Sequence, residues 1–164
     1  MAIGIQSEIA LVREEQFPFG SLSTTENITE DPVGKIARKK WGHSLDAGFQ
    51  IIPDVLFRCQ KLLDLEAVDV VILLNITTHW WEYDDLPYPR PSIIAKRMNL
   101  STRTVERRIS EMQKNGFLIR LASERKKGKT IRPYDLSGLV EKLKLFSTGN
   151  LVRRRADSRK HRSG

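Results

Sequence analysis

The sequence predicts a mainly α-helical fold that carries one small β-hairpin, flanked by an irregular N-terminal leader and a basic C-terminal tail. Three observations lead to this prediction. Apolar residues recur at helical spacing in several short stretches of residues 49–148. Residues 91–118 predict two helices joined by a tight turn, and residues 119–134 alternate like two short strands. We therefore divide the chain into a leader (residues 1–48), a domain (residues 49–148) and a tail (residues 149–164).

The two ends of the chain predict little regular structure. Gly, Ser, Thr, Asn and Pro are scattered through the leader, which favours an irregular chain. Its first dozen residues are apolar enough to form a short strand or helix against a partner. The tail is strongly basic and has little to bury, so we expect disorder there. It is either an electrostatic arm for nucleic acid or a solubilising tail.

The first half of the domain predicts two helices. Residues 53–63 carry one apolar stripe at spacings i, i+1, i+4, i+7 and i+8. Cys59, the single cysteine, lies on this stripe, which predicts a buried thiol and excludes an internal disulfide. Asp64 is the expected N-cap of the second helix, whose body, residues 67–76, is apolar nearly all round apart from Asp69. Such a helix is either the centre of the domain or part of a contact with a second chain, and the second interpretation predicts a homodimer.

A polar loop and a proline-rich segment follow. Trp80 and Trp81 cannot both face inward on one helix, so we expect one in the core and the other over the loop or a partner. The His and acidic residues between 79 and 85 lack the ligand spacing of zinc or calcium sites, so no metal site is predicted. The prolines between 87 and 91 lead an extended segment into the next helix.

Residues 91–118 predict a helix, a sharp turn and a second helix. Asn99 tolerates the left-handed conformation that such a turn needs. Ser101 is a good N-cap for a helix over residues 102–115, and Gly116 predicts its end. The buried stripe of this helix, at spacings i, i+4 and i+7, is Val105, Ile109 and Met112.

A basic hairpin and a closing helix complete the predicted domain. Residues 119–134 predict two strands around a polar turn at residues 123–129. Asp135 or Ser137 then begins the last helix. Its apolar face is Leu136, Leu139, Val140, Leu143 and Phe146.

The charge of the 164-residue chain is divided unevenly. Its net charge of +8 is the sum of −2 over residues 1–50, −5 over residues 51–89 and +15 over residues 90–164. This asymmetry indicates a polyanionic partner, with nucleic acid ahead of an anionic membrane surface. The longest apolar run, residues 70–74, is too short to cross a bilayer, and no signal peptide is visible, so we expect a cytoplasmic protein associated with the nucleoid.

The order of elements from about residue 49 to residue 146 resembles the winged helix-turn-helix domains of bacterial, phage and plasmid proteins. The phrases IPDVLFRCQKLL, IAKRMNLSTRTVERRI and KNGFLIR are similar to those of small bacterial regulators and of phage and plasmid replication initiators. One departure is Asn99, where that family usually has Gly. The resemblance implies binding of double-stranded DNA, with a recognition helix over about residues 102–115 in the major groove and a wing over about residues 119–134 on the backbone.

Opposite the apolar stripe of this recognition helix we expect Arg103, Arg107, Ser110 and Lys114, with Thr104 and Glu106 beside them and Arg108 nearer the stripe. The N-terminal half of such a helix enters the major groove, where arginine can bridge guanine O6 and N7. The candidates for reading bases are Thr102, Arg103, Thr104, Glu106 and Arg107, with Arg103 and Arg107 the strongest. The candidates for the DNA backbone are Ser101, Arg108, Ser110 and Lys114, and on the wing Arg125, Lys126, Lys127 and Lys129. An acidic neighbour is the alternative partner of Arg108.

The leading functional hypothesis is a sequence-specific binder of double-stranded DNA that regulates transcription. One alternative is an initiator of DNA replication or plasmid maintenance that binds repeated origin sites. The other is a scaffold subunit of a larger complex, in which the basic wing and tail bind nucleic acid and the apolar leader docks on protein. The sequence shows no nucleophile–base pair, no framed pair of carboxylates and no cofactor loop, so we expect no catalytic site, no cofactor and no enzymatic activity.

Overall fold

A computed structural model of the chain describes residues 32–82 and 84–147, and it forms two compact units, Met1–Phe49 and Gln50–Gly164. In the first unit, helix α3 (Pro32–Trp41) leads into a 3-10 helix, η1 (Gly42–Ala47). The expectation of an irregular leader is therefore wrong for this stretch. Arg38 helps to hold it, because its guanidinium donates to the Gly42 carbonyl at 3.2 Å and pairs with Asp46. The first dozen residues and the tail lie outside the described residues.

The second unit begins with a helix that is shorter than the sequence predicts. Helix α4 spans only Val55–Arg58, and turns follow it as far as Asp64. Asp64 has a φ of 54°, so it occupies the left-handed region and is not the predicted N-cap. The turns break the apolar stripe after Cys59, which is buried as predicted, and leave Leu62 71% exposed.

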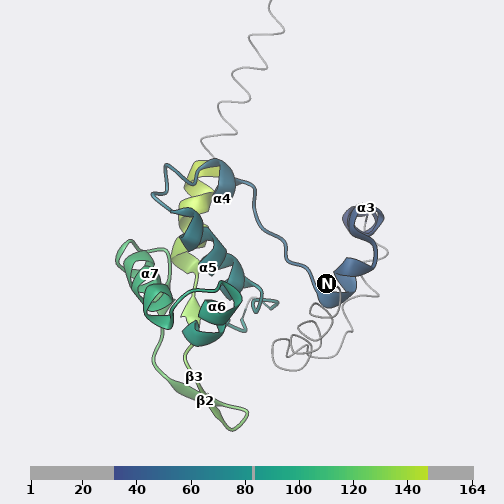
Figure 1. The fold of residues 1–164 in the computed structure, drawn as a ribbon. Helices are drawn as coiled ribbons and strands as arrows, with labels where there is room; N and C mark the ends of the chain where they lie inside the picture. Colours follow the sequence, from purple (N-terminus) through teal and green to yellow (C-terminus); the bar gives the residue numbers. More distant parts are fainter. Residues whose placement is uncertain (1–31, 83, 148–164) are drawn as a thin grey trace, which may run out of the picture. The chain divides into compact units, whose positions relative to one another are not determined.

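Helix α5 (Ala67–Thr77) is the centre of the second unit. Its N-cap is Glu66, whose backbone N–H donates to the Asp69 carboxylate at 2.9 Å. Val70, Ile72, Leu73 and Ile76 from α5 are buried in the core. Helices α6 and α7 both contact α5 and also contact each other, and Figure 1 shows the three helices grouped together. The tryptophans after α5 divide as expected, since Trp80 packs against the core and Trp81 is exposed.

The helix, turn and helix lie where the sequence predicts them. Helix α6 (Pro91–Arg97) has Pro91 in its first turn, and helix α7 (Thr102–Lys114) follows. Asn99 takes a φ of 52° at the turn between them, as expected. The Ser101 hydroxyl caps α7 by accepting from the Thr104 backbone N–H at 3.0 Å. The predicted stripe of Val105, Ile109 and Met112 is buried.

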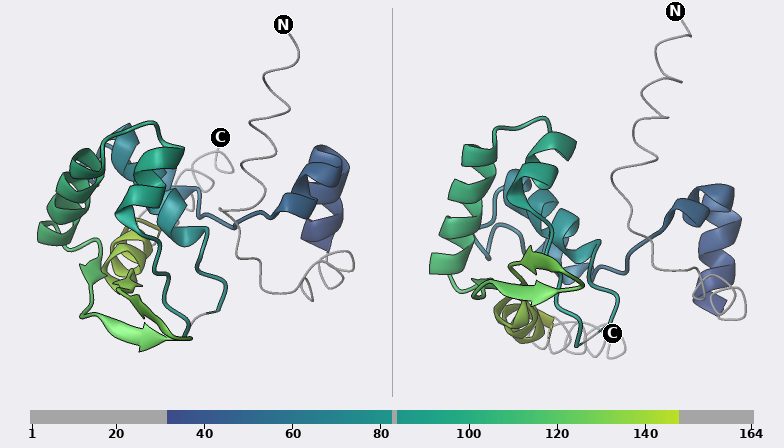
Figure 2. Two further views of the ribbon diagram at one scale, coloured as in Figure 1. Left: turned by 60° about the horizontal axis from the view of Figure 1, so that its bottom comes forward. Right: turned by 90° about the horizontal axis from the view of Figure 1, so that it is seen from below.

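The hairpin consists of two short ladders that follow each other along one arm (Figure 2). Near the core, β1 (Ile119–Arg120) pairs with β4 (Tyr134–Asp135); further out, β2 (Glu124–Lys126) pairs with β3 (Lys129–Ile131). Lys127 and Gly128 join β2 to β3 with φ values of 49° and 75°. Two consecutive residues with positive φ are typical of a type I′ turn, which matches the natural twist of a hairpin.

A helix over residues 137–147 closes the core. The Asp135 carboxylate accepts from the Ser137 backbone N–H at 2.8 Å at its start. Leu136, Leu139 and Leu143 are buried, as the predicted apolar face requires. A Cβ atom at Gly138 would lie 2.2 Å from the carbonyl oxygen of Gly116, so this helix begins directly against the backbone that ends α7.

Candidate nucleic-acid interface

The outward face of α7 is polar and basic. Thr102, Arg103, Glu106 and Arg107 are exposed along its N-terminal half, and Ser110 and Lys114 are exposed further along. Thr104 differs from the other predicted base readers, because it is half-buried and its hydroxyl lies 2.8 Å from the Ser101 hydroxyl. The helix therefore brings most of its predicted DNA-contacting side chains onto one accessible face.

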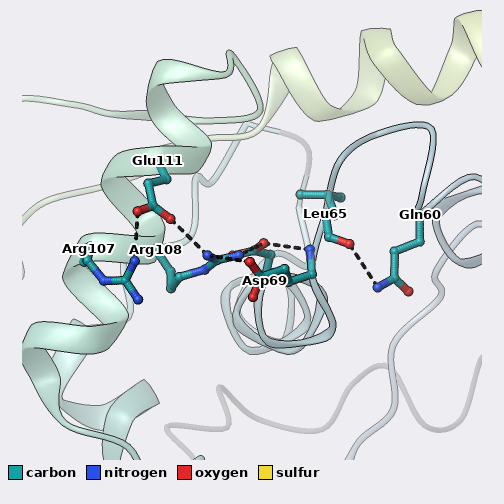
Figure 3. A network of polar contacts seen from close by, with 7 residues as sticks. Gln60, Leu65, Asp69, Arg107, Arg108 and Glu111 are labelled. Carbon is teal, nitrogen blue, oxygen red and sulfur yellow. Dashed lines mark hydrogen bonds and ion pairs between the residues drawn. The ribbon is translucent and has the colours of Figure 1, made fainter.

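Glu111 connects two arginines on this helix. Its Oε1 lies 3.0 Å from Arg107 Nη1, and its Oε2 lies 3.0 Å from Arg108 Nη1 (Figure 3). The Arg107 side chain is 61% exposed. An exposed pair at this spacing contributes only a few tenths of a kcal/mol, roughly 0.2–0.5. Arg107 is therefore accessible and weakly held, and Glu111 limits the directions in which it points.

Arg108 does not belong to the exposed face. Its side chain is 11% exposed, and its Nε donates to Asp69 Oδ1 at 2.7 Å while Nη2 pairs with Asp69 Oδ2 (Figure 3). Glu66 adds a contact at 3.1 Å. The hydrogen bonds that Arg108 donates to Asp69 raise the pKa of Arg108, whereas burial lowers it. Arg108 thus has the acidic-neighbour role that was its alternative, and we withdraw it as a DNA-backbone contact because its donors are already used.

The four cations on the hairpin that are predicted to contact the DNA backbone fall into two groups. Arg125, Lys127 and Lys129 are exposed. Lys126 is half-buried, because its ammonium pairs with Asp85 and lies 5.2 Å from the centroid of the Tyr88 ring. The hydrogen bond to Asp85 raises the pKa of Lys126.

The sequence allowed an acidic neighbour for Arg108 but did not identify the acidic partners of these cations, which are Glu111, Asp69 and Asp85. The position of Glu111, three and four residues after the two arginines, is a readable signal for ion pairs on one helix. Asp69 also gave a signal, since a lone carboxylate in an apolar helix needs a partner. No local pattern connects Lys126 to Asp85, which lies 41 residues earlier.

No group of three or more His, Cys, Asp or Glu side chains among the described residues could hold a metal ion. No helix in the described part of the chain is long and apolar enough to cross a membrane.

Comparison with known proteins assigns the second unit to a family. The sequence model of the DnaD N-terminal domain matches residues 52–150, which is more than half of the chain. The crystal structure of the N-terminal domain of DnaD protein from Geobacillus kaustophilus HTA426 is similar, with a TM-score of 0.48 and 24% sequence identity over 74% of this chain and 96% of that chain. No curated protein matches the sequence. The chain therefore belongs to the DnaD N-terminal domain family.

Proposed function

We propose that this protein is a winged helix-turn-helix domain that binds double-stranded DNA through α7 and the hairpin. We further propose that this binding takes part in DNA replication. Family membership supports a role in bacterial replication, and supports it better than the transcriptional role. The observation that carries DNA binding is the exposed face of α7 beside a hairpin with three exposed cations. In this proposal the protein is not an enzyme and acts at the nucleoid in the cytoplasm.

The two elements have different tasks in this proposal. The N-terminal half of α7 enters the major groove, where Arg103 and Arg107 read base edges by their paired N–H donors. Thr102 and Glu106 lie beside them on the same exposed face. Arg125, Lys127 and Lys129 of the hairpin bind phosphates, which sets affinity and position but carries no sequence information.

A scaffold role is a second candidate, and exposed apolar side chains favour it. Phe57 of α4, Leu62 in the turns that follow α4, and Val71 of α5 are exposed. Exposed apolar side chains indicate contacts between proteins where they form a continuous patch. Light scattering of the purified chain tests whether the partner is a second copy, and stable co-purification with another protein supports the scaffold role.

Selection of bound sequences from a pool of random duplexes, followed by footprinting at an origin and at promoters, tests the main proposal. Footprints repeated in tandem at an origin support replication. A single inverted repeat at a promoter supports transcription instead. Failure to retain any duplex at low salt overturns the proposal of DNA binding.

Replacement of Arg107 by Ala is expected to weaken binding to the selected site by about tenfold, within the usual 1–3 kcal/mol for a base-reading arginine. It also relaxes the sequence preference, because the lost contact is to a base. Lys127→Ala is expected to weaken selected and random duplexes alike. Fluorescence anisotropy with both duplexes measures these changes.

Arg58→Ala is the matched control for Arg107→Ala. Arg58 is an exposed arginine in an i, i+4 ion pair with Asp54, but it lies on α4, away from α7 (Figure 1). It should leave the affinity for both duplexes close to that of the unaltered chain. Equal losses on selected and random DNA for Arg107→Ala would contradict base reading by this side chain.

A further inference from the structure

The segment from Asp85 to Tyr88 lies against the hairpin. Asp85 pairs with the Lys126 ammonium, and the Tyr88 ring lies 5.2 Å from the same nitrogen. Between these residues, the Pro87 carbonyl accepts from the Tyr134 backbone N–H at 2.8 Å. The segment therefore contacts both the outer and the inner ladder of the hairpin.

The register of the outer ladder shows on which face of the hairpin the contact between Asp85 and Lys126 lies. Lys126 is paired with Lys129, and Arg125 with Thr130. Residues that pair directly share a face of the sheet, and neighbours along a strand point to opposite faces. Lys126 and Lys129 thus share one face and Arg125 lies on the other. Of these three cations, only Lys126 contacts the segment from Asp85 to Tyr88 among the described residues.

We propose that Asp85 occupies Lys126 in place of a DNA phosphate and thereby lowers the affinity of the hairpin for DNA. This inference rests on the proposed function, since it needs DNA at the hairpin. A carboxylate and a phosphate offer an ammonium group the same kind of charge-assisted hydrogen bond. The Asp85 side chain is 55% exposed, and exposed ion pairs are weak, so a phosphate can displace it at a modest cost in affinity.

Tyr88 and the backbone keep the hairpin in place without Asp85, so Asp85 is not needed to position Lys126. Its ring keeps the ammonium in place when the carboxylate is removed, because a cation close to an aromatic face is attracted to it. The backbone bond from Tyr134 to Pro87 also stays, so loss of Asp85 alone does not release the hairpin. Asp85→Asn is therefore expected to free a cation that is already in position.

The test measures binding of the full chain to a fluorescein-labelled duplex of mixed sequence by anisotropy over a range of salt concentrations. The variants are Asp85→Asn, Asp84→Asn, Lys126→Met and the double variant Asp85→Asn with Lys126→Met. Asp84 is the control, because it is an exposed carboxylate of the same loop. Asp85→Asn is expected to bind up to about fivefold more tightly than Asp84→Asn at about 0.1 M salt, which is the most that removal of a weak exposed ion pair allows.

The double variant tests whether the gain passes through Lys126. Asp85→Asn should give no more tightening in the Lys126→Met chain than Asp84→Asn gives in the unaltered chain. If Asp85→Asn binds like Asp84→Asn, or more weakly, the inference is wrong while DNA binding stands. If none of the chains binds the duplex at low salt, both the inference and the proposed function are overturned.

Discussion

Replacement of Arg108 by Ala is expected to lower the free energy of unfolding by about 3–5 kcal/mol, the usual cost of removing one partner of a buried ion pair. The Asp69 side chain is 4% exposed, and the Arg108 guanidinium contacts both of its oxygens. Without the guanidinium, the carboxylate stays buried with the Glu66 backbone N–H as a hydrogen-bond donor. Urea denaturation followed by circular dichroism measures the change as a shift of the midpoint.

Two further variants make this result specific. Arg107→Ala removes the neighbouring arginine, which also contacts Glu111 but is 61% exposed, and should cost no more than about 0.5 kcal/mol. Arg108→Met combined with Asp69→Leu replaces the buried pair by apolar groups, and should cost less than Arg108→Ala alone. A loss for Arg108→Ala no larger than that for Arg107→Ala would show that the pair is not buried in solution.

Replacement of Gly138 by Ala is expected to destabilise the domain by about 3 kcal/mol, at the upper end of the cost of overpacking. Helix propensity alone predicts the opposite sign, since Ala is favoured over Gly in a helix by about 1 kcal/mol. The added Cβ would lie 2.2 Å from the Gly116 carbonyl oxygen and 3.2 Å from its carbon. Both atoms are backbone, so the helix over residues 137–147 must shift away from the end of α7. Thermal unfolding measures the loss as a fall in Tm.

Ser137→Ala is the matched control for this substitution. Ser137 is exposed in the same helix turn, and its recorded hydrogen bond at the start of the helix is made by its backbone N–H, which Ala keeps. Its stability should stay within about 0.5 kcal/mol of the unaltered chain, as for most surface changes. A Gly138→Ala chain that is as stable as this control would contradict the close contact between the two backbones.

The elements with complete local signals were predictable from the sequence. In α7, the cap at Ser101, the stripe ending at Met112 and the stop at Gly116 all agree, and the helix lies within a residue of its expected bounds. Asn99 marked the turn before it for a similar reason, because few residues tolerate a φ of 52°. Agreement between cap, pattern and stop is what made these boundaries reliable.

Where the predicted elements were wrong, the sequence pattern fits two different local structures equally well. The stripe through Cys59 fits a helix over residues 53–63, but it fits equally well a short helix followed by turns that bury Leu63. Asp64 was chosen as a cap because aspartate caps helices, yet aspartate also tolerates the left-handed turn that it occupies. The helical stretch within the leader was hidden by the scattered turn-forming residues around it.

The candidate site was predictable as a set of cations but not as a set of contacts. Exposure of Arg103 and Arg107 follows from helical periodicity once Val105 is taken as inward. Arg108 pairs with Asp69, 39 residues earlier, and Lys126 pairs with Asp85, 41 residues earlier. Both ion pairs depend on how these distant segments pack against each other. Such pairs decide which cations remain available to a ligand, and no local pattern encodes them.

The Asp69 carboxylate has a consequence for how the domain opens. The same side chain accepts from the first turn of α5 and from the guanidinium of α7. We therefore expect α5 and α7 to open together, as one cooperative unit in hydrogen exchange. The spacing of the outward side chains of α7 is thus protected by the stability of the whole domain.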